Sequence, residues 1–232
     1  MRQSLLVVVT AACAAVAGGI GSGLVTQANA KASLDQTNQR LTLLEDHNAI
    51  MNLNRIYGYY LDKALFNQLL DLFTEDVSLE YSGRGVYIGK QRATQLMKAM
   101  PGGETGLQDG MLQNHMQIQG VVHVDPNGQT AKGRWRALIM MKFAGEKGQE
   151  AWQEGIYENE YRKENGVWKF SKVHFYLNVN ADYHEGWAKS TGWMPGIDKN
   201  FPPDKPPSDP NYKSYPAAYI PPFHYKNPVT GK

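Results

Sequence analysis

Cysteine is almost missing from this sequence: Cys13 is the only one in 232 residues. One cysteine cannot form a disulfide within the chain, so the fold depends on its hydrophobic core, which a chain of this length can bury. Cys13 lies in an apolar N-terminal segment, away from the other candidate functional residues. The sequence therefore excludes a disulfide scaffold and predicts no cysteine nucleophile.

An excess of one charge sign is also missing, because 24 Lys and Arg residues face 22 Asp and Glu residues. Binding to nucleic acid or to an anionic membrane surface usually depends on such an excess. There is no nucleophile elbow, phosphate loop or dinucleotide fingerprint, and Gly83-Arg84-Gly85 is typical of a turn. His115 and His123 lie too far apart along one predicted strand to share a metal ion. We expect no cofactor, no metal and no nucleic-acid partner.

The N-terminus has the pattern of a secretory signal peptide. Arg2 supplies a positive charge, residues 5–17 are apolar, and Ala28-Asn29-Ala30 fits a cleavage site. A membrane anchor is the alternative, but the apolar run is short for a spanning helix, which needs about 20 residues. We therefore expect residues 1–30 to be removed. No integral membrane segment then remains, and the mature protein is periplasmic or secreted.

The rest of the chain divides into a domain and an arm. Residues 31–177 are predicted to form one domain, in which residues 31–43 are a polar helical lead-in. After about Asn178 prolines cluster, with Tyr, Trp and Phe between them. The aromatic residues argue against a disordered tail. We expect residues 178–232 to form an extended arm laid over the domain or over a neighbouring subunit.

Hydrophobic periodicity predicts helices first and strands later. A helix ending near residue 61 is predicted by apolar residues three and four positions apart, namely Ile50, Leu53, Tyr57, Tyr60 and Leu61. The predicted elements continue with a helix over 66–73, strands over 77–81 and 85–88, a helix over 90–100, and strands over 115–124, 130–143, 151–161 and 168–177. This order predicts an α+β fold, with helices packed on a curved antiparallel sheet.

Asp62 is a carboxylate among phenols, and burial would raise its pKa into a range useful for proton transfer. It is either an acid-base group, or the partner that orients His115, or a surface aspartate at a helix end. Tyr57 and Tyr81 either donate hydrogen bonds to a substrate oxygen or pack in the core. Strand alternation places His115 with Gln117, on a face that is either solvent-exposed or the polar side of a pocket.

Four more residues are candidates for substrate binding in the wall of a pocket: Tyr60, Trp135, Tyr157 and His174. His174 is also a candidate second acid or base. Asp76 stands at a helix-to-strand junction, where carboxylates commonly brace a turn, so we interpret it as structural.

Several strings resemble the SnoaL-like branch of the nuclear transport factor 2-like superfamily over roughly residues 44–176. They are Tyr57 to Asp62, Leu72-Phe73-Thr74-Glu75-Asp76-Val77, Tyr81, Gly85 to Gly89, His115, and Tyr157-Glu158 to Tyr161 with Gly166-Val167-Trp168-Lys169-Phe170. The resemblance implies a cone-shaped sheet and helices around one apolar pocket. The superfamily that the chain resembles includes dehydratases, ketosteroid isomerase and formaldehyde lyases, and many non-catalytic binding domains.

In the dehydratases, the matching positions Tyr57, Asp62, Tyr81 and His115 form the catalytic site. The resemblance thus implies a cofactor-independent lyase, of the dehydratase or formaldehyde-releasing retro-aldol type, that acts on a hydrophobic oxygenated aromatic or polycyclic small molecule by Asp/His acid-base catalysis. A ketosteroid-type isomerase and a non-catalytic small-molecule-binding protein are the alternatives. Family members are usually dimers or trimers, so a homo-oligomer is expected.

Overall fold

A computed structural model describes residues 20–145 and 149–232. The chain divides into two units, Met1–Leu41 and Thr42–Lys232. In the first unit, residues 20–41 are helical and belong to α1 (Ile20–Asp62). Most of the expected signal peptide lies outside the described residues. In the part of the chain that the structure describes, no helix combines the length and apolarity needed to cross a bilayer.

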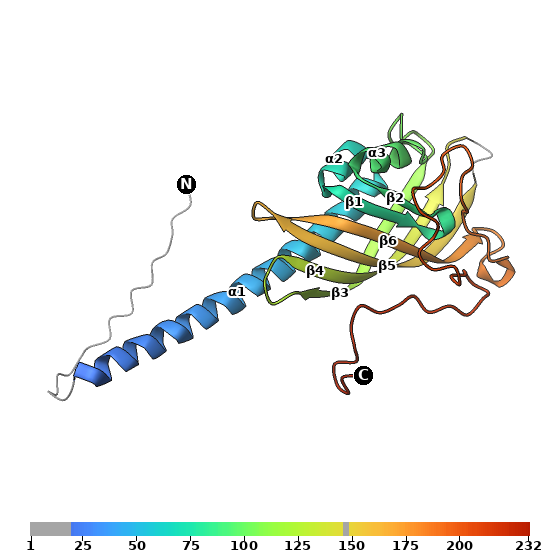
Figure 1. Ribbon diagram of the computed structural model, residues 1–232. Helices are drawn as coiled ribbons and strands as arrows, with labels where there is room; N and C mark the ends of the chain where they lie inside the picture. Colours follow the sequence, from blue (N-terminus) through green and yellow to red (C-terminus); the bar gives the residue numbers. More distant parts are fainter. Residues whose placement is uncertain (1–19, 146–148) are drawn as a thin grey trace. The chain divides into compact units, whose positions relative to one another are not determined.

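Six strands of the second unit form one sheet in the order β2-β1-β6-β5-β4-β3 (Figure 1). The strands are β1 (Phe73–Tyr81), β2 (Val86–Ile88), β3 (Leu112–Val124), β4 (Thr130–Lys142), β5 (Glu150–Glu164) and β6 (Val167–Asp182). β3 to β6 form an antiparallel meander, whereas β1 pairs with β6 in parallel. The curved sheet is not closed. The predicted α+β class is confirmed.

The helices bury one apolar side each. α2 (Phe66–Asp71) and α3 (Lys90–Lys98) lie together beside β1 and β2 (Figure 1). On α1 the predicted spacing is confirmed from Ile50 onward, because the side chains at 50, 53, 57 and 61 all join the core. These helices and the sheet enclose a core that is rich in aromatic rings.

The strands bend at irregularities in their pairing. Register shifts occur between Ile118 and Val121 and between Glu154 and Gly155. Such bulges bend a strand and increase its twist. At Gly155 a Cβ atom would lie 2.4 Å from the ring of Phe175, so only glycine lets the two strands approach this closely.

Strand alternation gives the sheet an inner and an outer face. On β5, Tyr157 belongs to the inner face with the core, and Glu158 belongs to the outer face. On β6, Phe175 belongs to the inner face, and His174 and Tyr176 belong to the outer face. An outer face would normally contact solvent, yet His174 and Tyr176 are buried.

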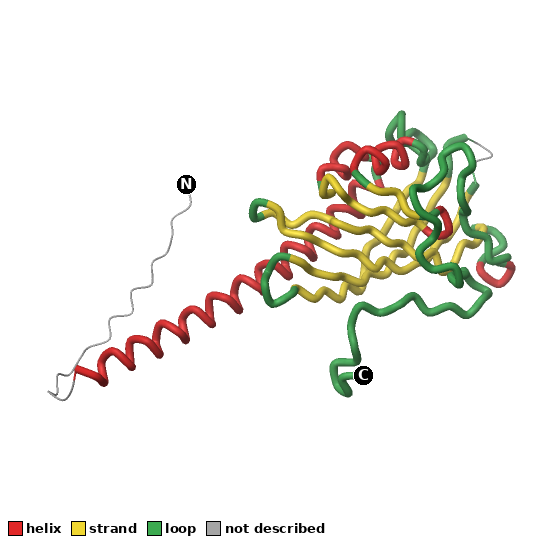
Figure 2. The backbone as a smooth tube through the Cα atoms, in the orientation of Figure 1, coloured by secondary structure: helices red, strands yellow, loops and turns green. Residues whose placement is uncertain are grey.

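The C-terminal arm, residues 183–232, covers that outer face and one sheet edge. Apart from the short helical turn η2 (Trp187–Lys189) it has no helix or strand (Figure 2). Lys205 pairs with Val86 of the edge strand β2, with N···O distances of 2.9 and 3.2 Å. The Tyr212 hydroxyl donates to the Leu177 carbonyl at 2.7 Å. β6 itself continues to Asp182, past the predicted end at residue 177, because residues 179–182 pair with the start of β5.

Candidate active site

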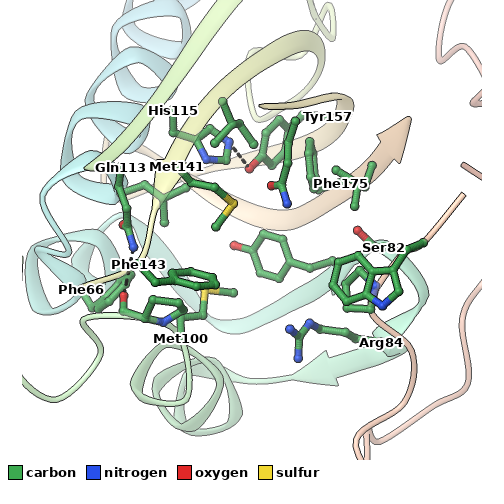
Figure 3. Close-up of a pocket in the computed structure, with 18 residues that line it drawn as sticks. Phe66, Ser82, Arg84, Met100, Gln113, His115, Met141, Phe143, Tyr157 and Phe175 are labelled. Carbon is green, nitrogen blue, oxygen red and sulfur yellow. Dashed lines mark hydrogen bonds between the residues drawn. The ribbon is translucent and has the colours of Figure 1, made fainter. Parts of the chain in front are cut away.

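An apolar cavity of about 270 Å³ lies on the inner side of the sheet. Its walls come from α1, α2, five strands and the C-terminal arm. The lining residues are Leu61, Phe66, Tyr81, Ser82, Arg84, Met100, Pro101, Gln113, His115, Ile139, Met141, Phe143, Gln153, Tyr157, Phe175, Leu177, Trp193 and Pro195. Figure 3 shows aromatic and methionine side chains surrounding this space. Such a cavity suits a small molecule with a largely apolar body.

His115 of β3 and Tyr157 of β5 meet at the cavity wall. The Nε2 atom of His115 lies 2.9 Å from the Tyr157 hydroxyl oxygen (Figure 3). Burial lowers the pKa of His115 to about 3 and raises the pKa of Tyr157 well above 10. At neutral pH the imidazole and the phenol are therefore both uncharged. A neutral imidazole that is hydrogen-bonded to a phenol forms a short path for a proton.

Tyr81 and Tyr57 form a second pair of phenols. Their hydroxyl oxygens are 2.7 Å apart. Tyr81 lines the cavity, whereas Tyr57 stands behind it at 0% exposure, with its ring centroid 5.2 Å from that of Phe170. Burial raises the pKa of both phenols well above 10, so both hydroxyls stay protonated. The pair can present an O–H donor to an oxygen atom of a bound molecule.

Asp62 ends α1 and contacts the main chain of His115 rather than its ring. The Asp62 carboxylate accepts a hydrogen bond from the His115 backbone N–H. β3 is an edge strand of the sheet, so this N–H has no strand neighbour on that side and the carboxylate satisfies it. Burial raises the pKa of Asp62. Asp62 does not line the cavity; it lines an open groove with Arg55 and Tyr59.

Three residues predicted to bind substrate lie away from the cavity. Tyr60 is half-buried against the core. Trp135 is buried and donates from Nε1 to the Tyr161 hydroxyl at 2.9 Å. His174 lies on the outer face, stacked on Tyr176 with centroids 4.0 Å apart, under the arm. Of the four predicted substrate-binding residues, only Tyr157 lines the cavity.

The sequence interpretation missed several lining residues. Gln113 precedes His115 by two positions and shares its strand face, but the predicted strand began only at residue 115. Arg84 was interpreted as part of a turn. Trp193 and Pro195 come from the arm, which has no periodic pattern that would have placed them at a cavity. Among the described residues, no group of three or more His, Cys, Asp or Glu side chains is arranged to hold a metal ion.

Comparisons with known structures support the fold. A protein of Novosphingobium aromaticivorans, provisionally assigned as a scytalone dehydratase, is 22% identical over 66% of this chain and 98% of its own, with a TM-score of 0.53. A hexachlorocyclohexane dehydrochlorinase, LinA type 2, is 24% identical over 68% of this chain and 99% of its own, with a TM-score of 0.53. A nuclear transport factor 2-like protein with a cystatin-like fold, also from N. aromaticivorans, is 21% identical over 62% of this chain and 89% of its own, with a TM-score of 0.50.

A search of curated proteins gives no significant match. The model of the SnoaL-like domain matches residues 42–174, which is more than half of the chain and contains every strand except the end of β6. The described cavity, the helices and the curved sheet agree with this match. The chain therefore belongs to the SnoaL-like domain family, within the nuclear transport factor 2-like fold.

Proposed function

We propose that this protein is a cofactor-independent lyase that removes water or formaldehyde from a hydrophobic, oxygenated aromatic or polycyclic molecule. The observation that carries this proposal is the contact between the neutral His115 ring and the Tyr157 hydroxyl at the wall of an apolar cavity. The names of two structural neighbours, a dehydratase and a dehydrochlorinase, describe eliminations and support the same class of reaction.

In loss of water, His115 accepts a proton from the substrate carbon, directly or through the Tyr157 hydroxyl. The carbon–oxygen bond then breaks and the same proton passes to the departing oxygen, so water leaves and the protein is unchanged. In release of formaldehyde, the proton comes from a hydroxymethyl oxygen and returns to the carbon left after the carbon–carbon bond breaks. Negative charge developing on the substrate raises the pKa of the adjacent imidazole, which allows a ring with a resting pKa of about 3 to take the proton.

Tyr81 stabilises the substrate oxygen that gains charge. Tyr81 lines the cavity, and the Tyr57 hydroxyl at 2.7 Å orients the Tyr81 hydroxyl. A hydrogen-bond donor that is fixed in a dry site stabilises developing charge more than water does. Asp62 is a positioning residue in this scheme, because its carboxylate holds the His115 backbone and not the reacting groups.

The test is turnover by the purified full-length protein on a panel of aromatic and polycyclic alcohols and hydroxymethyl compounds, with mass spectrometry to detect lost water or formaldehyde. His115→Ala and Tyr157→Phe should each reduce turnover at least about a hundredfold. Tyr183→Phe is the matched control, since Tyr183 is exposed and outside the cavity. Full turnover in both site variants, with unchanged folding, would contradict the proposed site.

Two alternative functions predict different results in the same experiment. A ketosteroid-type isomerase would give a product of unchanged mass, and its rate would still depend on His115. A non-catalytic binding protein would bind panel members without converting them. Neither the wild type nor His115→Ala would then show turnover. The histidine at the cavity wall with its phenol partner favours the lyase, because a purely apolar container needs no such pair.

We also propose that the protein is exported and forms a homo-oligomer. The signal-like pattern of residues 1–30 supports export, which N-terminal sequencing of protein from the periplasm would test. Recovery of the protein only in the cytoplasm with an intact N-terminus would contradict it. Light scattering of the full chain tests whether it forms a dimer or trimer. A monomer at micromolar concentration would contradict the proposed homo-oligomer.

A further inference from the structure

Among the lining residues that the structure describes, Arg84 is the only one that is charged at neutral pH. The other residues of the lining are apolar or neutral, and the His115 ring is uncharged there. Arg84 ends the short turn η1 (Ser82–Arg84) that follows β1. In Figure 3 its guanidinium points toward the enclosed space, from the side opposite His115. The cavity thus has a positive end and a proton-transfer end.

Arg84 also differs from the other arginines of the sheet and α3. Arg92, Arg134, Arg136 and Arg162 each form an ion pair with a carboxylate. Arg84 forms no ion pair or side-chain hydrogen bond within residues 20–145 and 149–232, although its side chain is only half-exposed. Withdrawing a cation from water without a partner costs free energy, so the site favours binding of an anion.

Contacts on both sides hold Arg84 at the cavity. A Cβ atom at Gly83 would lie 2.9 Å from the Pro195 carbonyl oxygen, and one at Gly85 would lie 2.6 Å from Pro203 Cγ. Gly85 also has a φ of +89°, which favours glycine. The turn that carries Arg84 is therefore packed against the arm, whose Trp193 and Pro195 line the same cavity.

We infer that the substrate is an amphipathic carboxylic acid, with its carboxylate on Arg84 and its apolar body in the cavity. A guanidinium pairs with a carboxylate through two parallel hydrogen bonds. A phosphate ester carries close to two negative charges near neutral pH, and the single charged residue of the described lining, Arg84, matches a single charge better. This inference rests on the proposed lyase function for the statement that the acid is the substrate.

Calorimetric titration with a matched pair of probes, 2-naphthoate and 2-naphthylmethanol, tests this assignment without requiring turnover. The wild-type full chain should bind the acid at least about tenfold more tightly than the alcohol. A higher salt concentration should weaken binding of the acid and leave binding of the alcohol unchanged. Arg84→Gln should remove that preference and leave binding of the alcohol unchanged, while Arg84→Lys should retain part of it. Arg136→Gln is the control, because Arg136 lies outside the cavity lining and pairs with Glu154.

The inference is overturned if the wild type shows no preference for the acid, including the case in which neither probe binds, or if Arg84→Gln binds the acid as the wild type does. Equal thermal unfolding temperatures of the wild type and Arg84→Gln confirm that any loss is local. Suppose that Arg84→Gln loses acid binding while His115→Ala retains full turnover. The anion site at Arg84 would then be supported, and the proposed catalytic residues would be rejected. The two proposals can thus fail separately.

Discussion

The carboxylate of Asp62 accepts a hydrogen bond from the backbone N–H of His115, which joins the end of α1 to the edge strand β3. This contact fixes the strand at the residue whose ring faces Tyr157. Asp62 was a candidate for direct proton transfer with the His115 ring, and its carboxylate instead meets the main chain. Its influence on the reaction would act through the position of His115.

Asp62→Asn should therefore fold and retain most of the turnover, because the amide oxygen can still accept the hydrogen bond. Asp62→Ala leaves the His115 N–H without that acceptor and should lower the free energy of unfolding by about 1–3 kcal/mol. Urea unfolding and turnover of both variants, measured beside His115→Ala, give the comparison. An Asn variant as inactive as His115→Ala would mean that the carboxylate itself transfers a proton.

Gly58 lets α1 approach β3 closely at this same joint. A Cβ atom there would lie 3.0 Å from the His115 carbonyl oxygen and 2.9 Å from Gln117 Cγ. Gly58→Ala gains about 1 kcal/mol of helix propensity, but a backbone oxygen cannot move aside as a flexible side chain can. We expect net destabilisation of about 1–3 kcal/mol in chemical unfolding, and reduced turnover.

The control for Gly58→Ala is Tyr59→Ala, next along the helix and exposed, which should change stability by about 0.5 kcal/mol or less. An alanine at position 58 that raises stability would show that α1 and β3 are not in close contact.

Stability should fall in mild acid because the half-buried His115 and the buried His174 are both neutral in the folded protein. The pKa of each is lowered to about 3 by burial, against about 6.5 in an unfolded chain. Below pH 6.5 the unfolded chain binds protons that the folded chain does not, so the stabilisation is complete above pH 6.5 and is lost between about 6.5 and 3. The slope is at most about 1.4 kcal/mol per pH unit for each histidine.

Urea unfolding between pH 7 and 4 measures this slope. His115→Asn should make it shallower, and His184→Asn should not, because the His184 side chain is 76% exposed. The raised pKa of Asp62 acts in the opposite direction, since protonation of a buried carboxyl favours the folded state. An unchanged slope in His115→Asn would indicate that this ring is solvated.

The arm is anchored at Glu80, which is 2% exposed on the outer face. Its carboxylate accepts hydrogen bonds from the Ser208 backbone N–H at 2.8 Å and the Ser208 hydroxyl at 2.6 Å. Ser208→Ala removes the second bond and should destabilise the protein by about 1–3 kcal/mol. Hydrogen exchange should also become faster around residues 204–214.

Ser190→Ala is the matched control for Ser208→Ala, because Ser190 donates only to a main-chain carbonyl, that of Asn180. It should cost about 1 kcal/mol and leave exchange at residues 204–214 unchanged. Equal exchange rates there in Ser208→Ala and the wild type would contradict the anchoring role.

The elements could be predicted from the sequence where one face is buried and the period is regular. The spacing from Ile50 to Leu61 identified the inner side of α1, and alternation identified the strands. Prediction failed where burial comes from a distant segment. His174 was a candidate for the pocket wall, but it lies on the outer face of the sheet, where the arm buries it. The path of an arm without periodicity, and hence Trp193 in the cavity lining, depends on tertiary contacts that no local pattern encodes.

Trp193 and Pro195 lie outside residues 42–174, the part of the chain that matches the family model. One cavity wall is therefore an addition to the shared domain, built from sequence that can diverge without disturbing any strand of the sheet. Exchanging this segment between related chains would change which molecules the cavity admits while leaving His115 and Tyr157 in place. The shape of this wall can therefore change without any change in the residues that we propose for proton transfer.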